Sequence, residues 1–201
     1  MKKSIKTLII ANLIGTALLF ATSVHAQFSG GIRAGANLAT EKYPGFTMQN
    51  AVLGYGGAFA TYQLNPIAFQ LEADYSGEGG NLKAAFSGQI NKYRETYLNV
   101  PLLVQAWFPS GAYVEFGGQE GFLTSSTYNF NNNGNVNTRS IYKNTNFSIG
   151  GGAGYEFQKR SAKGLSINFR FMQGLTAISS SGSGSEAITT NAFSLGLSER
   201  F

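Results

Sequence analysis

Hydrophobic residues recur at every second position through most of the chain, and this period of two is the feature that most constrains its fold. In PIAFQLEADYS, residues 66–76, Ile67, Phe69 and Leu71 alternate with Gln70 and Glu72. Successive side chains of a β-strand point to opposite faces. Each such stretch therefore predicts a strand with one apolar and one polar face.

Eight segments and their connections predict one closed sheet. Seven segments alternate clearly, at residues 28–39, 66–76, 95–108, 112–123, 146–157, 165–174 and 191–201, and an eighth at 51–64 has ambiguous parity. Long polar connections at 40–50, 77–91, 124–145 and 176–190 alternate with short ones at 64–66, 109–111 and 158–164. Pro101 cannot donate to a ladder, so a bulge or weakened pairing is expected there. The order is that of an eight-stranded, antiparallel up-and-down β-barrel.

The first 26 residues predict a cleavable secretory signal peptide. Lys2, Lys3 and Lys6 precede an apolar run over residues 8–20, and Val24-His25-Ala26 follows as a small-x-small cleavage site. A membrane-anchoring helix is the alternative, but it needs about 20 apolar residues. Cleavage is expected between Ala26 and Gln27, which leaves residues 27–201 as one barrel domain.

The composition of residues 27–201 fits a membrane barrel better than a soluble domain. Removal of the signal takes three of the 15 basic residues and none of the ten acidic ones, so the net charge falls from +5 to +2. This small charge does not support nucleic-acid binding. About 13% of the remaining residues are charged, roughly half the usual fraction of a soluble domain. Few charges and many glycines suit strands of which one face meets lipid.

The polar face is expected to point into the barrel. It is rich in glycine, which suits an eight-stranded interior that side chains just fill. It also carries charges of both signs, and an arginine facing lipid at mid-depth would cost about 2–4 kcal/mol. The predicted lumenal polar network comprises Arg33, Glu72, Asp74, Glu95, Glu115, Glu156 and Arg170. We expect both arginines to contact carboxylates, Glu72 or Glu115 first; the alternative is that these are ordinary solvated strand positions.

Three short motifs, in order, resemble the PorT-like outer-membrane β-barrel domain family over residues 27–201. They are G-x-x-x-G-x-N, Tyr-Leu-x-x-Pro and Gly-x-Gly-x-x-Phe. They fall at Gly31, Gly35 and Asn37, at Tyr97, Leu98 and Pro101, and at Gly152, Gly154 and Phe157. The resemblance implies an eight-stranded barrel in the outer membrane of a Gram-negative cell, with termini in the periplasm and long loops outside. Family members mostly lack an assigned activity. The founding member takes part in secretion of cell-surface proteins, but no residue here carries that role over.

The last strand has an apolar stripe that ends on an aromatic residue. The stripe consists of Phe193, Leu195, Leu197 and Phe201. It is expected to face lipid. A terminal aromatic after alternating apolar residues also resembles the C-terminal assembly signal that the barrel-insertion machinery reads.

The residue types available favour a structural or surface-interaction role without catalysis. Cysteine is absent and the single histidine, His25, lies in the signal, so histidine triads, thiol nucleophiles and typical zinc sites are excluded. No cofactor or metal is expected, and acid–base work by Glu72 and Asp74 is less favoured than a polar network. The Asn-rich stretch 129–137 predicts a mobile surface loop with a possible receptor or adhesion role. Two alternatives stay open: a soluble lipocalin-like barrel that binds an apolar ligand, and an accessory subunit of a secretion or uptake complex.

Overall fold

The protein is all-β. The computed structural model describes residues 28–43, 46–47, 49–83, 90–129, 134–158, 162–178 and 189–201. The strands are β1 (Phe28–Tyr43), β2 (Phe46–Thr47), β3 (Gln49–Leu64), β4 (Ile67–Lys83), β5 (Ile90–Trp107), β6 (Ala112–Asn129), β7 (Asn135–Asn137), β8 (Thr145–Glu156), β9 (Leu165–Gly174) and β10 (Thr189–Arg200), with one 3-10 turn, η1 (Arg139–Ile141). The predicted signal peptide and its cleavage site at Ala26 and Gln27 lie outside the described residues.

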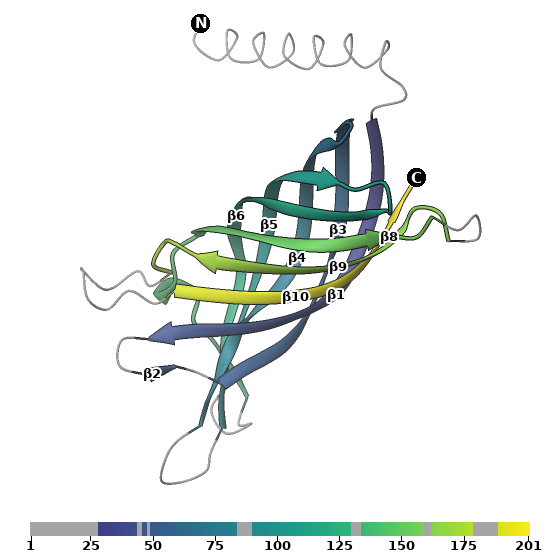
Figure 1. Cartoon of the computed structure of the whole chain (residues 1–201). Helices are drawn as coiled ribbons and strands as arrows, with labels where there is room; N and C mark the ends of the chain where they lie inside the picture. The colour runs from purple at the N-terminus through teal and green to yellow at the C-terminus, as the bar shows by residue number, and fades with distance from the viewer. Residues whose placement is uncertain are drawn as a thin grey trace, which may run out of the picture.

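Eight long strands form one closed antiparallel barrel (Figure 1). Neighbours in sequence pair in the order β1, β3, β4, β5, β6, β8, β9 and β10. The first and last strands close the sheet through twelve residue pairs, from Gly31–Arg200 to Lys42–Thr189. Strands β2 and β7 only add short pairings to β1 and β6. The eight-stranded up-and-down barrel expected from the alternation is confirmed.

The two ends of the barrel differ. At the end that we call the terminal end, β1 begins, β10 finishes and three short connections join β3 to β4, β5 to β6 and β8 to β9 (Figure 1). The opposite end, the loop end, carries the other four connections. Within the described ranges, no helix has the length and hydrophobicity that crossing a membrane requires.

Strands reach further toward the loop end than the alternation predicts. Residues 77–83, 90–91 and 124–129, expected in loops, extend β4, β5 and β6. Part of the Asn-rich stretch is also paired, because Asn135–Asn137 form β7 against β6. The outer face of these extensions lacks the apolar residues that the same strands carry nearer the terminal end. Their sequence therefore resembles a loop, although backbone pairing continues.

Irregular pairing occurs at three places. The β4–β5 ladder leaves Glu72 and Ala73 without assigned partners opposite Pro101, which is the weakened pairing expected beside a residue that lacks a backbone N–H. Its register does not shift there. Register shifts occur instead between Asn50 and Tyr55 on β3 and between Thr96 and Tyr97 on β5.

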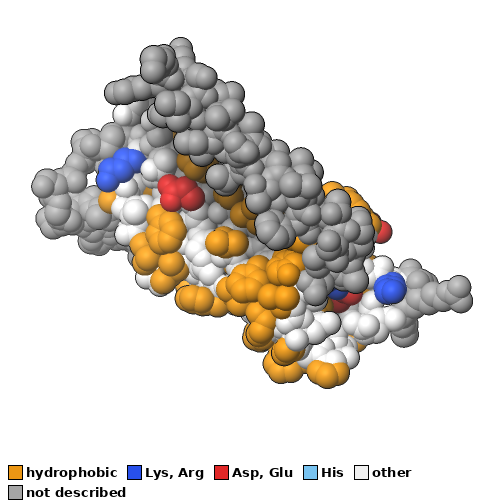
Figure 2. Space-filling view, turned by 90° about the horizontal axis from the view of Figure 1, so that it is seen from above, with side chains coloured by type: hydrophobic (Ala, Val, Ile, Leu, Met, Phe, Trp, Pro, Cys, Tyr) orange, Lys and Arg blue, Asp and Glu red, His pale blue; other side chains and the backbone are white. Residues whose placement is uncertain are grey.

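Apolar side chains cover the outside of the barrel and polar ones fill its inside. The outward set includes Ile32, Val52, Phe69, Leu71, Leu102, Phe116, Phe169, Phe193, Leu195 and Leu197, all exposed. The inward set includes Arg33, Glu72, Glu115 and Arg170, all buried. Even-numbered residues of β3 point outward, which resolves the ambiguous segment 51–64. In Figure 2 hydrophobic side chains gather over much of the described outer surface.

Substituting Leu71→Arg should destabilise the barrel in lipid vesicles. Leu71 faces outward in the middle of the apolar stripe of β4, which runs from Ile67 to Tyr75, and it pairs with Ala60 and Leu102, so the new charge is expected to lie in the hydrocarbon layer. The expected loss is about 2–4 kcal/mol of unfolding free energy, measured by denaturant titration. Val136→Arg, on the exposed β7, is the control and should change stability by no more than about 0.5 kcal/mol. Equal effects of the two substitutions would show that Leu71 does not contact lipid.

Candidate functional site: the polar lumen

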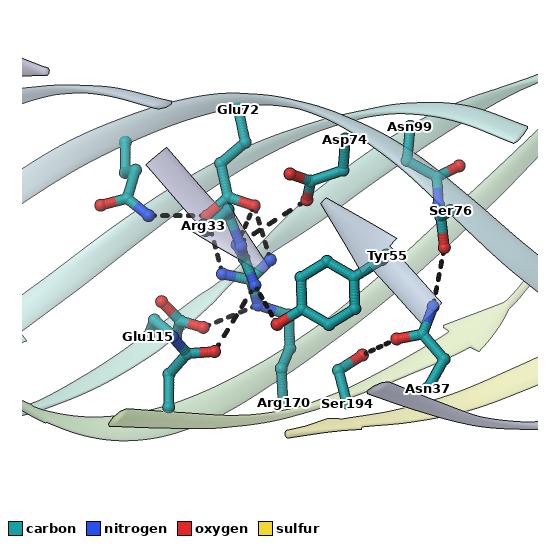
Figure 3. A network of polar contacts seen from close by, with 12 residues as sticks. Arg33, Asn37, Tyr55, Glu72, Asp74, Ser76, Asn99, Glu115, Arg170 and Ser194 are labelled. Atoms are coloured by element: carbon teal, nitrogen blue, oxygen red, sulfur yellow. Dashed lines mark hydrogen bonds and ion pairs between the residues drawn. The ribbon is translucent and has the colours of Figure 1, made fainter. Parts of the chain in front are cut away.

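An ionic cluster of four residues occupies the middle of the lumen (Figure 3). Arg170 of β9 donates to Glu72 of β4 through Nη1 at 2.7 Å and Nη2 at 2.8 Å. Its Nε donates to Glu115 Oε1 of β6 at 2.7 Å. Arg33 of β1 also pairs with Glu72. The cluster thus joins four strands across the barrel, and it contains the contacts expected for both arginines.

Arg33 is held by further contacts. Its Nη2 donates to the Tyr55 hydroxyl at 3.1 Å, and its guanidinium lies 5.0 Å from the centre of the Tyr55 ring. Asp74 Oδ2 is 3.8 Å from Nη1. Tyr55 fits across the lumen because Gly196 leaves room; a Cβ at Gly196 would overlap the Tyr55 hydroxyl. Glycine on the polar face therefore accommodates a larger side chain from another strand.

A second group closes the terminal end of the lumen. Arg200 of β10 pairs with Glu156 of β8, and its guanidinium lies 4.9 Å from the centre of the Trp107 ring. Trp107 in turn stacks on Tyr113, with ring centroids 4.6 Å apart. Its indole N–H donates to Gln105 at 3.1 Å. Two aromatic rings and an ion pair therefore lie between the central cluster and the opening.

A small apolar cluster lies toward the loop end. Tyr97 of β5 and Leu123 of β6 pack with Tyr142 and Ile178 from the connections of this end, and all four are buried. The backbone N–H of Lys143 donates to the Ile178 carbonyl at 2.7 Å, which ties the two connections together.

The single network predicted from the sequence is divided into separate groups along the lumen. Arg33, Glu72, Asp74, Glu115 and Arg170 lie together in its middle. Glu95 and Glu156 also point inward and are buried, but neither joins this cluster. Glu156 lies at the terminal end with Arg200, and Glu95 lies toward the loop end. Inward direction follows from parity, whereas depth follows from strand register, which the sequence pattern does not reveal.

Sequence reasoning missed several lumenal residues. Glu41 and Glu78 are buried on the inner face of β1 and β4, at positions that were expected in loops. Extending the period of two beyond the apolar segments would have found them. Arg200 belongs to the last strand but was not assigned a role; only its pairing with Glu156 reveals one.

Two small cavities lie within the described part of the lumen, and a larger pocket of about 400 Å³ opens at the terminal end beside Glu156 and Arg200. One cavity of about 20 Å³ lies between the central cluster and Trp107, and another of about 30 Å³ lies on the loop side of Arg33 and Arg170. Each holds one or two water-sized molecules. No three acidic side chains of the described residues are already arranged to hold a metal ion. The carboxylates of Glu72 and Glu115 are engaged by the guanidinium groups of this cluster.

The closing strand presents its apolar stripe outward. Phe193, Leu195, Leu197 and Phe201 are exposed, with Phe201 the most exposed at 79%. Phe193 stacks on Phe169 of β9 with ring centroids 6.0 Å apart, and its ring also contacts the tilted ring of Phe171 at 4.5 Å. The outward direction is as expected; contact with lipid and the role in assembly stay predictions.

Comparisons with known proteins agree with this architecture. Residues 20–180 match the family model described as outer membrane protein beta-barrel domain. A search of curated proteins found no match. The crystal structure of Neisserial surface protein A (NspA) aligns with a TM-score of 0.57 at 11% identity, covering 86% of this chain and 97% of that one.

Two further solved structures align at lower scores. Ail, the attachment invasion locus protein of Yersinia pestis, solved with the heparin analogue sucrose octasulfate, gives a TM-score of 0.49 at 11% identity, covering 87% of this chain and 99% of that one. OprG from Pseudomonas aeruginosa gives 0.37 at 13% identity, covering 87% and 94%. At these identities the similarity to NspA supports the fold alone.

Substituting Arg170→Met should cost about 3–5 kcal/mol of unfolding free energy, because it leaves Glu72 and Glu115 buried without this partner. Denaturant titration in detergent micelles measures the loss. Arg200→Met is the matched control, since the Arg200 side chain is 24% exposed against 4% for Arg170. Its ion pair should contribute no more than about 1 kcal/mol. A loss for Arg170→Met no larger than for Arg200→Met would contradict a stabilising role of the central cluster.

Proposed function

The chain belongs to the outer membrane protein β-barrel domain family, and from that premise we propose that it is a non-enzymatic surface protein with a sealed lumen. It is a small eight-stranded barrel of the outer membrane. Its role in this proposal is to present the connections of its loop end to a partner outside the cell. The observation that carries the proposal is that side chains fill the lumen over the described residues, which leaves the outer surfaces of the barrel for function.

The sealed lumen is supported at three levels. Trp107 and Tyr113 stack at the terminal end, the Arg33–Glu72–Arg170 contacts span the middle, and the cluster with Ile178 covers the loop end. An eight-stranded barrel has an interior that side chains just fill. Large solutes therefore have no path.

We propose that the terminal end faces the periplasm and the loop end faces the outside. The first residue of β1 and the last residue of β10 lie at the terminal end, where the short connections also lie. Short periplasmic turns and longer extracellular loops are the rule in outer-membrane barrels. The same proposal includes export directed by the signal peptide of residues 1–26 and membrane insertion that depends on the apolar stripe ending at Phe201. It also includes membership of the PorT-like group that the sequence motifs resemble.

The soluble lipocalin-like alternative is not favoured. It requires apolar side chains around a cavity, whereas Leu71, Phe169 and Leu195 are exposed on the outside. The two small cavities between the described strands are lined mostly by polar side chains, and their volumes of about 20 and 30 Å³ are too small for an apolar ligand. An accessory role in a secretion complex is the second candidate function. It predicts that a pull-down from detergent extract recovers the barrel in stoichiometric amounts with a larger assembly.

Epitope tags test the proposed orientation. A tag inserted within residues 130–133, between β6 and β7, should be labelled by antibody on intact cells. A tag inserted within the short connection 109–111, between β5 and β6, should be labelled only after the outer membrane is permeabilised. Both proteins should keep the heat-modifiable gel mobility of a folded barrel. Labelling of the second tag on intact cells would reverse the orientation.

Planar-bilayer recordings test the sealed lumen. The purified barrel should give no steady large-conductance pores, because aromatic rings and ion pairs block the axis. A variant with Trp107→Ala and Tyr113→Ala, which removes the stacked rings of the terminal end, should also stay closed, since the central cluster remains. Steady pores in the wild type would refute the proposal, and pores in the variant alone would place the seal at the terminal end only.

A further inference from the structure

Two carboxylates face outward among the apolar side chains of the barrel. Glu199 interrupts the apolar stripe of β10, between Leu197 and Phe201, and Glu120 lies in the outward register of β6. A charge on the lipid-facing surface is costly at mid-depth and much less costly near the ends of the strands. Glu199 is only two residues from Phe201, which is about 7 Å along the strand. Its position near the terminal end therefore makes an outward charge tolerable.

The neighbours of Glu199 on the outer surface are apolar. Glu199 pairs with Ile32 of β1 and with Leu165 of β9. The next residue, Arg200, points into the lumen and pairs with Glu156 there. Among the described residues, none of the ion pairs involves Glu199. Its exposed carboxylate is therefore available to a cationic group from another molecule.

An apolar groove lies beside this carboxylate on the outer surface, and we call it the seam groove. It has a volume of about 220 Å³ and lies where β1 meets β10, with β9 next to them (Figure 1). Arg33 and Ser198 also border it, but both residues line the lumenal cavity of about 20 Å³ and direct their side chains there. Four apolar residues complete the border with Glu199: Ile32, Ala34, Leu165 and Leu197.

Aromatic side chains mark the membrane boundary near the same end. Phe28 and Tyr62 contact each other with ring centroids 4.7 Å apart, and Tyr155 and Phe157 do so at 5.5 Å. Girdles of aromatic residues in outer-membrane barrels lie at the interfaces between hydrocarbon and water. The seam groove runs from Glu199 toward Ala34 and Leu197, which are further from the terminal end. Its acidic end thus lies at headgroup level and its apolar end in the hydrocarbon layer.

This arrangement matches the two parts of a phospholipid with an ammonium headgroup. Burial of an acyl chain in the apolar part is favourable in proportion to the area removed from water or from looser contacts. An ammonium group forms short, charge-assisted hydrogen bonds with a carboxylate. Lys163, two residues before Leu165, is exposed at the terminal end and is available to the phosphate that all such lipids share.

We propose that the seam groove binds one phospholipid of the phosphatidylethanolamine class. One acyl chain lies along Ile32, Ala34 and Leu197, and the headgroup ammonium donates to the carboxylate of Glu199. The bound lipid covers the seam at which the first and last strands close the barrel. The site goes beyond the proposed surface role, and it does not depend on which end of the barrel faces the outside of the cell.

Native mass spectrometry of the full barrel tests the site. The barrel is released from vesicles that contain equal amounts of phosphatidylethanolamine and phosphatidylglycerol with identical acyl chains. The wild type should retain one phosphatidylethanolamine about three to ten times as often as one phosphatidylglycerol, because only the first lipid has an ammonium group for Glu199. Glu199→Gln should retain the two lipids equally while keeping the heat-modifiable mobility of a folded barrel.

Two further variants separate the groove from general surface charge. Glu120→Gln removes the other outward carboxylate, which lies between Val100 and Phe147 and away from the seam groove, and it should keep the wild-type preference. Ala34→Phe fills the groove with Glu199 intact and should lower the retention of phosphatidylethanolamine.

Several outcomes would overturn the proposal. They are equal retention of both lipids by the wild type, an unchanged preference in Glu199→Gln, and an equal loss of preference in Glu120→Gln. A full preference in Ala34→Phe would also overturn it, because the carboxylate would then attract the headgroup without the groove.

Discussion

Pairing between the first and the last long strand is the constraint on which the rest of this structure depends. In hydrocarbon, backbone N–H and C=O groups find no water, so a sheet must close to satisfy them. Twelve pairs between β1 and β10 join segments that are separated by most of the chain. With eight strands, this closure leaves an interior that side chains just fill. The need for glycine at position 196, beside Tyr55, follows from that radius.

Closure of the barrel also determines where charged side chains can lie. Lipid outside the barrel excludes ionic side chains from one face of each strand, and the narrow lumen brings those on the other face together. Arg33, Glu72, Glu115 and Arg170 come from four different strands, yet they form one set of hydrogen bonds. In this lumen, pairing replaces the water that these groups lose on burial. On the loop side, the same confinement places Glu78 of β4 opposite Glu95 of β5.

Alternation predicted the strands well because each face of a membrane strand meets a different medium. It predicted inward Arg33 and Arg170 and outward Leu195 for the same reason. It failed at residues 77–83 of β4, which are rich in glycine and lack an alternating apolar set, although the ladder continues. Depth was also beyond its reach: Glu95 and Glu156 have the right parity but lie toward opposite ends of the lumen, because pairing register sets height along the axis.

The extended β5–β6 hairpin has a consequence for molecular recognition. The last outward apolar pair is Leu98–Phe122, and the ladder continues to Lys92–Asn129, about 20 Å further along the strands. A segment that is already hydrogen-bonded has few backbone conformations left to lose when another molecule docks on it. The paired edge formed by β6 and β7 is therefore preorganised. A partner that binds there loses less free energy to ordering the protein, so it should bind more tightly than to a flexible loop of the same composition.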